Sequence, residues 1–545
     1  MYAKHFLLFV FLSNIALIQG QVFQGSKEYT RGDTLRGSLR PERSSYDVLK
    51  YNLNVKVEPS KKYISGFNEI FFRVIENMPI MQLDLFENMK VDSIVHQGEK
   101  LNYTRDFNAV FITFKNALIA ETIDSLSIHF SGHPTIAKTP PWDGGFVFSK
   151  DKNGKDWVSV AVQGTGASLW YPNKDHQSDK PEEAEIHVAA PNGLMNISNG
   201  RFTGKKDLEN GFTEWSWKVT NPINNYNIIL NIGDYVHFAD KFRDLDLNYY
   251  VLAYNLEKAK KQFQEVIPMM ECFYEHFGEY PFKEDAYKLV ETPYLGMEHQ
   301  SAIAYGNEYK MGYAGTDISK TGIGKKFDFI IIHETGHEWF GNSITSSDIA
   351  DMWIHEAFTS YAEAVYIECR WGKEDALKYF NGLQKTMISN EEAIIGDYGV
   401  NKEGSFDMYY KGANMLNTIR SVINDDEKWW ALVKDFSENF KHKITNSEEV
   451  IAFFEENSNE TLAPIFNQYL YHSKIPVLLL KKEKKRIYYR WDASVENFKM
   501  PIDVKLGKRI KRIKPNSDWE KLRGTRKMRK VNPDLERFYV EVEKL

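Results

Sequence analysis

The spacing of apolar residues divides this chain into three parts. Between residue 51 and about residue 240, apolar side chains alternate with polar ones or form short runs, such as 126–130 and 226–232, as strands do. From Asn255 to Phe277 they recur three and four positions apart, the period of an amphipathic helix. Strand-like segments return after Pro476. The pattern predicts a β-rich N-terminal unit, a mainly helical middle unit kinked at Pro268, and a short β-rich tail.

The first twenty residues have the composition of a secretory signal peptide. Lys4 supplies a positive charge, residues 6–17 form an apolar stretch, and Gly20 is a small residue near the expected cleavage point. The alternative is an uncleaved membrane anchor, but the apolar stretch is shorter than the roughly 20 residues that span a bilayer. We therefore expect cleavage of residues 1–20, a mature chain from Gln21 without stable membrane insertion, and a secreted or periplasmic location.

Composition and charge favour an ordered protein without a nucleic-acid partner. Aromatic residues make up 14% of the chain and charged residues 26%, which supplies ample apolar surface for packed domains. The net charge is −6, whereas binding to nucleic acid would normally demand a basic excess. In the basic segment 481–512 the charges alternate with apolar residues, which is typical of strands with a solvated face.

The chain has two cysteines, Cys272 and Cys369, so a disulfide framework is not expected to hold the fold. Export would permit one bond between them, but both lie in helical patterns with aromatic neighbours. We expect both to be buried thiols.

The most informative residues are His333, Glu334 and His337, which follow an apolar run at 329–332 and indicate a buried helix. Positions four apart share one helix face, so both histidines can point at one ion while Glu334 projects beside the open coordination position. Zinc accepts such nitrogen ligands at about 2 Å. A motif this short also arises by chance, so the prediction of a zinc site depends on further residues.

A catalytic zinc site normally adds one more protein ligand and a water, and that ligand is expected on a separate segment. Glu356 is the candidate, because eighteen residues separate it from His337 and it lies in a second helical pattern that can pack against the first. Glu363 follows Glu356 by seven residues, near two helical turns, so it should share that face and orient a ligand histidine. The predicted cofactor is one Zn²⁺ per chain.

Longer motifs around these residues resemble the gluzincin zinc aminopeptidases, the aminopeptidase N family, which is related to leukotriene hydrolase. Residues 333–342 read HETGHEWFGN, and residues 353–363 read WIHEAFTSYAE. Residues 294–300, YLGMEHQ, look like the family's exopeptidase motif GxMEN, and residues 409–412, YYKG, look like its YxKG segment. The motifs occur in the family's order, and the likeness extends over roughly residues 45–540.

The resemblance implies an α+β multidomain fold. Its parts are an N-terminal antiparallel β domain, a thermolysin-like helical catalytic domain and a small C-terminal β-sandwich, without the large helical C-terminal domain of many relatives. The boundaries we expect are 43–240, 241–473 and 474–545.

The resemblance also implies roles at the metal. His333, His337 and Glu356 bind zinc. Glu334 activates the attacking water as general base, and Tyr409 stabilises the oxyanion.

At the amine end of the substrate, the resemblance implies that Glu298 binds the free amine, with Gln163 and Met297 beside it. Some positions depart from the family pattern. Thr165 stands where many relatives carry an acidic residue, and His299 stands where the exopeptidase motif has asparagine. His355 likewise replaces an asparagine, so the details of amine recognition differ from the family pattern.

Together these inferences predict a zinc metallo-aminopeptidase, a hydrolase of peptides with a free N-terminus. The rival hypotheses on the same metal site are a catalytically weak peptide-binding protein, an endopeptidase and an epoxide hydrolase. Retention of Glu334 and Tyr409 argues against the binding protein, and Glu298 argues against internal cleavage.

Overall fold

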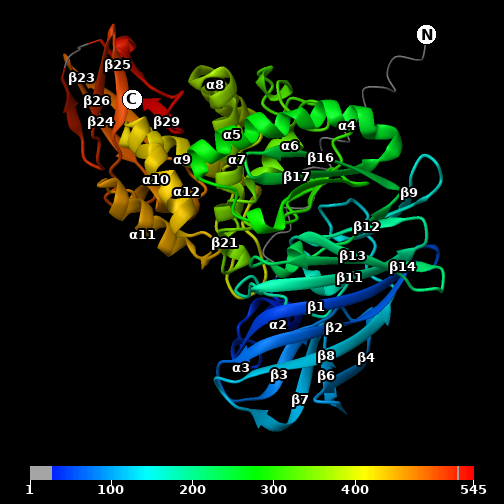
Figure 1. Cartoon of the computed structure of the whole chain (residues 1–545). Helices are drawn as coiled ribbons and strands as arrows, with labels where there is room; N and C mark the ends of the chain where they lie inside the picture. The colour runs from blue at the N-terminus through cyan, green and yellow to red at the C-terminus, as the bar shows by residue number, and fades with distance from the viewer. Residues whose placement is uncertain (1–27, 524–526) are drawn as a thin grey trace, which may run out of the picture.

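The computed structural model describes residues 28–523 and 527–545, so the predicted signal peptide lies outside the described residues. The chain passes from a strand-rich unit (blue to cyan in Figure 1) through a unit of helices and strands (green) and a group of helices (yellow) to a small strand-rich unit (red). This order confirms the predicted α+β fold. Within the described ranges, no helix is long and apolar enough to cross a membrane.

A large sheet forms the body of the N-terminal unit. Its central strand β1 (Tyr46–Glu58) pairs antiparallel with β2 (Tyr63–Val74) and parallel with β11 (Glu183–Pro191), so the sheet is not purely antiparallel. Alternate side chains of β1, such as Tyr51 and Leu53, are fully buried, which confirms the strand predicted from their alternation. The other strands of this sheet are β13 (Arg201–Asp207), β14 (Phe212–Val219), β8 (Ile123–Gly132), β4 (Met89–His96) and β5 (Glu99–Lys100).

Smaller sheets share a hydrophobic core with the large one. The same core includes Tyr294 and Met297 of the middle unit, so apolar packing joins the two units beside the exopeptidase motif. One of these sheets consists of β3 (Met78–Asp84), β7 (Ala109–Leu118) and β6 (Asn102–Asp106), and another of β12 (Met195–Ile197), β15 (Asn231–Gly233), β10 (Asp156–Ala161) and β9 (Gly145–Lys150). Gln163 lies two residues beyond the end of β10.

The middle unit begins with its own sheet. β16 (Tyr235–Phe242) spans the expected boundary at residue 240 and pairs with β17 (Leu245–Leu252) along its whole length. The sheet continues through β18 (Tyr287–Glu291) and β20 (Ile303–Tyr305) to the edge strand β19 (Gly296–Met297). The exopeptidase motif therefore starts at a sheet edge.

Helices complete the middle unit. α4 (Leu256–Gln262) passes into a 3₁₀ turn before α5 (Val266–Phe277) begins. The expected break thus occurs just before Pro268, because a proline ring clashes with the carbonyl four residues earlier. The following helices are α6 (Phe329–Gly336), α7 (Trp353–Trp371), α8 (Lys373–Thr386), α9 (Tyr410–Ile423), α10 (Asp426–Asn439), α11 (Ser447–Ser458) and α12 (Ala463–Leu470).

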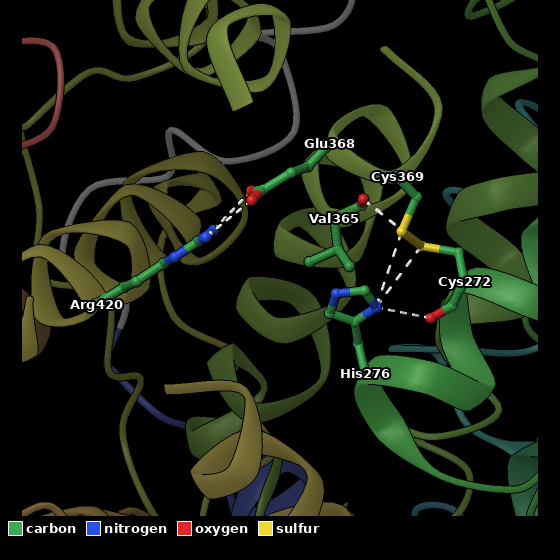
Figure 2. Close-up of a disulfide and its surroundings, with 6 residues drawn as sticks. All are labelled: Cys272, His276, Val365, Glu368, Cys369 and Arg420. Atoms are coloured by element: carbon green, nitrogen blue, oxygen red, sulfur yellow. Dashed lines mark hydrogen bonds and ion pairs between the residues drawn. A yellow bond between two sulfur atoms is a disulfide. The ribbon is translucent and has the colours of Figure 1, made fainter. Parts of the chain in front are cut away.

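The expectation of two buried thiols is wrong, because Cys272 of α5 and Cys369 of α7 form a disulfide (Figure 2). Their Cα atoms lie 6.1 Å apart, within the range of about 4.4–6.8 Å that a disulfide needs. Cys369 is exposed rather than buried. His276 lies beside both sulfur atoms and donates its Nδ1–H to the Cys272 carbonyl oxygen at 2.9 Å. The bridge joins the helix that carries Glu356 to the first long helix of the unit.

The C-terminal unit consists of short sheets. β24 (Arg486–Asp492) alternates buried and outward-facing residues, with Ile487 and Trp491 buried and Arg486 exposed. The basic segment therefore has the solvated strand faces that its alternation predicts. The strands are β23 (Val477–Glu483), β24, β27 (Glu520–Leu522) and β29 (Glu541–Lys544) in one sheet, and β25 (Ile502–Leu506), β26 (Arg509–Ile513) and β28 (Val531–Pro533) in another.

Candidate active site

Helix α6 presents the first part of the metal motif. Asp328 caps the helix, because its side chain accepts hydrogen bonds from the backbone N–H groups of Ile330 and Ile331. The assigned helix ends at Gly336, but His337 keeps helical backbone angles (φ −63°, ψ −21°). His333 and His337 therefore share a face as the sequence predicts, and their rings lie 4.9 Å apart.

Helix α7 brings Glu356 against these histidines. Glu356 Oε2 lies 3.8 Å from His333 Nε2 and 3.4 Å from His337 Nε2. All three side chains are buried, and one ligand atom from each lies within 4.8 Å of the others. Glu356 Oε2 has no hydrogen-bond partner, although a buried carboxylate oxygen normally has one. Two nitrogens and an unpartnered carboxylate oxygen in this arrangement fit the ligand set of a zinc ion.

The other ring nitrogens of the histidines are held by the protein. His333 Nδ1 donates to Glu363 Oε1 at 2.7 Å, and Glu363 Oε2 accepts from the Tyr379 hydroxyl at 2.6 Å. His337 Nδ1 bonds the carbonyl oxygen of Phe340 at 3.0 Å. These bonds leave both Nε2 atoms free to face a metal ion. Glu363 thus lies beside His333, one of the candidate zinc ligands.

Glu334 lies beside Gly296 of the exopeptidase motif. A β-carbon added to Gly296 would come within 2.8 Å of Glu334 Oε1, so a larger residue at this position would displace the carboxylate. Oxygen atoms of Glu334 and Glu298 and a nitrogen of His337 lie within 4.8 Å of one another. Burial raises the pKa of the Glu334 carboxyl well above its ordinary value, which makes the carboxylate a stronger base.

Glu298 is held by groups from both units. Gln163 Nε2 donates to Glu298 Oε1, and the Tyr226 hydroxyl lies 3.4 Å from the same oxygen. Asn342 Nδ2 donates to the Glu298 backbone carbonyl at 2.7 Å. Burial raises the pKa of Glu298 to about 7, although His337 opposes this rise. The two nitrogens of the His299 ring have no hydrogen-bond partner among the described residues, so Glu298 is not paired with its neighbour.

The structure brings the other predicted amine-site residue, Met297, into the buried edge strand β19 beside Glu298. Thr165 does not compensate for the missing acid, because its hydroxyl donates to the backbone carbonyl of Asp143 at 3.0 Å. An acidic side chain nevertheless lies close by: a β-carbon added to Gly164 would be 3.9 Å from Glu403 Oε2.

Tyr409 stands at the start of α9, and its ring stacks against His333 with 6.3 Å between the ring centroids. The neighbouring residues of its motif have structural contacts. Lys411 Nζ donates to the carbonyl oxygens of His472 at 3.0 Å and of Ser473 at 2.7 Å, which fixes α9 to the chain after α12. Gly412 permits close packing of α9 on α7, because a β-carbon there would lie 2.5 Å from the Ala357 side chain.

His355 has a structural contact in the described residues, because its Nε2 accepts the backbone N–H of Ser346 at 2.8 Å. The sequence indicates no role for Tyr226, Asn342, Tyr379 or Glu403. Asn342 belongs to the conspicuous HETGHEWFGN segment, but nothing in the sequence indicates its bond to residue 298. Tyr226 and Tyr379 lie outside the motifs, Glu403 lies six residues before Tyr409, and the contacts of all three arise only in the folded chain.

Comparisons with known proteins identify a peptidase domain in this part of the chain. The model of the peptidase family M1 domain matches residues 256–469, which carry the zinc-ligand candidates, the exopeptidase motif and Tyr409. This middle part of the chain therefore matches a peptidase family M1 domain, which supports the resemblance to the aminopeptidase N family. Zinc is the cofactor that this domain match implies.

Individual relatives are distant. The chain is 22% identical to a leucyl aminopeptidase of Saccharolobus solfataricus over 77% of this chain and 54% of that protein. It is 22% identical to the tricorn protease-interacting factor F2 of Thermoplasma acidophilum over 83% of this chain and 57% of that protein. The chain thus spans little more than half the length of these relatives.

A solved M1 zinc metallopeptidase from Deinococcus radiodurans is similar in fold over most of its length. It superposes with a TM-score of 0.66 at 17% identity, and the match covers 79% of this chain and 94% of that one.

Proposed function

We propose that this protein is a zinc-dependent aminopeptidase that removes single residues from the N-termini of peptides. The observation that carries the proposal is the position of Glu298. This buried carboxylate lies beside the three zinc-ligand candidates, and its side chain has no lysine or arginine partner among the described residues. A free N-terminal amine is a cation near neutral pH and would supply the missing partner.

His333, His337 and Glu356 would hold the ion. When bound there, zinc supplies a water whose pKa is lowered to about 7 and a Lewis acid for the substrate carbonyl. Glu334 then accepts the proton of the attacking water on its carboxylate and delivers it to the leaving amine. Its raised pKa suits both transfers, because the carboxyl has to take up the proton and release it again.

Tyr409 would stabilise the charge that develops on the carbonyl oxygen. Its ring lies over the candidate ligand His333, and its hydroxyl is close enough to Glu356 for that carboxylate to help raise the hydroxyl's pKa. A hydroxyl donor aimed at an oxyanion is worth about 2.7–4 kcal/mol of the barrier in comparable sites.

Glu298 would set the register of cleavage. Gln163 and Tyr226 orient its carboxylate, so an amine bound there presents the first peptide bond to Glu334 and to the water. A carboxylate in this position disfavours internal cleavage, because an internal peptide nitrogen carries no positive charge. The predicted export signal supports a secreted or periplasmic enzyme that acts on peptides outside the cytoplasm.

The test compares a peptide with its N-acetylated twin, using the zinc-loaded wild-type protein and Glu298→Ala. We expect the wild type to cleave only the free-amine peptide, and the variant to lose most of kcat/KM toward it, since a charged contact is worth roughly 1.5–3 kcal/mol. Equal cleavage of both peptides by the wild type would replace this proposal with an endopeptidase. Failure to cleave either peptide, with tight binding of both, would favour the peptide-binding protein.

A further inference from the structure

The C-terminal unit carries a charge opposite to that of the rest of the chain. Residues 474–545 include 22 lysine and arginine residues and 10 aspartate and glutamate residues, a net charge of +12, whereas the other residues together carry −18. In Figure 1 this unit (red) lies at one end of the molecule. The proposed reaction does not use the positive charge, because the candidate zinc ligands and Glu298 belong to the middle unit.

The hairpin of β25 and β26 is the most exposed part of this unit. β26 is an edge strand, and its consecutive residues Arg509, Ile510 and Lys511 are all exposed, whereas a strand covered on one face buries every second residue. Ile510 is 71% exposed. Lys505 of β25 lies opposite Ile510 in the register of the hairpin, so the two side chains share a face. An apolar side chain therefore stands in solvent among cations.

A neighbouring turn brings further cations to the tip of the hairpin. This 3₁₀ turn (Met528–Lys530) precedes β28, and its last residue accepts the backbone N–H of Gly507 at 3.1 Å. The sequence has no aspartate or glutamate between residues 504 and 517. Exposed cations of the hairpin and the turn form no ion pair with any described carboxylate: Lys505, Lys508, Arg509, Arg529 and Lys530. We call these five cations together with Ile510 the basic patch.

Protection of an edge strand explains only part of the basic patch. Lysine and arginine on edge strands prevent pairing with other chains, and Arg509 of β26 fits that role. Lys505 does not fit it, because β25 is the central strand of its sheet. Arg529 and Lys530 do not fit it either, since they precede β28 in a turn. The cations therefore share a location at the hairpin tip rather than a position on an edge.

The other end of the hairpin is fixed to the catalytic unit. Arg512 donates to the carbonyl oxygens of Ser421 at 2.7 Å and Val422 at 3.0 Å in α9, and it pairs with Asp503 at 2.9 Å. Asp503 and Arg512 lie opposite each other in the hairpin, away from its tip. The basic patch thus has a firm support, while its own charges have no partner in the described part of the chain.

We propose that the basic patch docks this protein on an anionic lipid surface, with its cations against the headgroups and Ile510 in the interfacial layer. Lysine and arginine side chains are attracted to anionic leaflets. Ile510 favours a lipid partner over a nucleic acid, because a membrane has an apolar layer behind its charges and a phosphate backbone has none. The contact is peripheral, in keeping with the finding that no described helix could cross a membrane.

The test is sedimentation of the zinc-loaded protein with vesicles of phosphatidylglycerol and phosphatidylcholine in equal parts, or of phosphatidylcholine alone. We expect the wild type to sediment with the anionic vesicles only and to be released by added salt, which screens exposed charges. The triple variant Lys505→Gln/Lys508→Gln/Arg509→Gln should lower the partition coefficient by about 100-fold, because each cation near such a surface contributes about fivefold. Ile510→Ser should lower it by about fivefold.

The matched control removes the same charge elsewhere and should leave vesicle binding within about threefold of the wild type. It replaces three exposed lysines of the other units that likewise form no ion pair among the described residues: Lys206→Gln/Lys258→Gln/Lys385→Gln.

Equal sedimentation with both kinds of vesicle would refute the proposal, and so would an equal loss in the two triple variants, since net charge rather than the basic patch would then govern binding. A DNA duplex is the competing probe. Tighter binding to the duplex than to anionic vesicles, unaffected by Ile510→Ser, would replace the lipid surface with a nucleic acid. Cleavage of a soluble peptide is measured separately and should be unchanged in every variant, so the docking proposal and the proposed function can fail independently.

Discussion

Replacing Glu363 should weaken zinc binding, although this residue does not touch the metal. Its carboxylate is fully buried and joins His333 to Tyr379 by hydrogen bonds of 2.7 and 2.6 Å. The first bond keeps the proton on Nδ1 of His333 and the lone pair of Nε2 toward the metal. Loss of such a partner costs about 10–100-fold in metal affinity, which is about 1.4–2.7 kcal/mol.

Variants of Glu363 and Tyr379 distinguish the loss of the hydrogen bond to His333 from a loss of side-chain packing. Glu363→Ala removes both bonds and should show the full loss, whereas Glu363→Gln keeps the volume and can accept from His333 with a neutral oxygen, so it should show a smaller loss. Tyr379→Phe leaves the bond to His333 intact and should reduce affinity by less than about threefold. The exposed Glu392→Gln is the control.

Zinc dissociation constants are measured by competition with a fluorescent chelator, with circular dichroism to check that each variant is folded. An unchanged zinc affinity in folded Glu363→Ala and Glu363→Gln would refute the reasoning, because the bond to His333 would then contribute nothing to the ligand.

Other substitutions test the remaining parts of the site and the fold. Glu334→Gln should abolish turnover yet retain one zinc per chain by metal analysis; substantial activity with zinc bound would remove the residue from proton transfer. Tyr409→Phe should lower kcat more than it changes KM, since its hydroxyl stabilises the transition state, and an effect confined to KM would contradict this. The double variant Cys272→Ser/Cys369→Ser should lower the free energy of unfolding by roughly 2–5 kcal/mol in denaturant titrations while zinc content stays the same; unchanged stability would show that the bridge adds no constraint.

The helical spacing of residues along the chain was enough to predict the helices that carry the candidate metal ligands. The spacing of His333 and His337 requires one helix face, and the structure has that face even though the assigned helix ends at Gly336. The seven-residue interval from Glu356 to Glu363 spans about two turns of α7, so Glu363 returns to the same side of the helix and meets His333 there. These arrangements could be predicted because the two residues of each pair belong to one helical segment.

Relations between distant segments could not be predicted in this way. The apolar run 226–232 suggests a strand, but only its end pairs with other strands, in β15. Tyr226, at its start, lies in a 3₁₀ turn, and the hydroxyl of this tyrosine contacts Glu298. The disulfide could not be predicted for the same reason. A helical pattern indicates which positions are apolar but not which helix packs opposite, so Cys272 could not be matched with Cys369 from sequence.

The carboxylates of this cleft connect its stability to its chemistry. Glu298, Glu334 and Glu356 are buried close together, and burial of charged groups without partners is costly. No lysine or arginine among the described residues forms an ion pair with them, and the raised pKa values of Glu298 and Glu334 express this cost. The cations that relieve it are those of the proposed reaction: the metal ion between His333 and Glu356, and the substrate's amine at Glu298. Each of these cations compensates part of the buried negative charge, so binding of the metal ion or of the amine stabilises the folded site relative to the empty one.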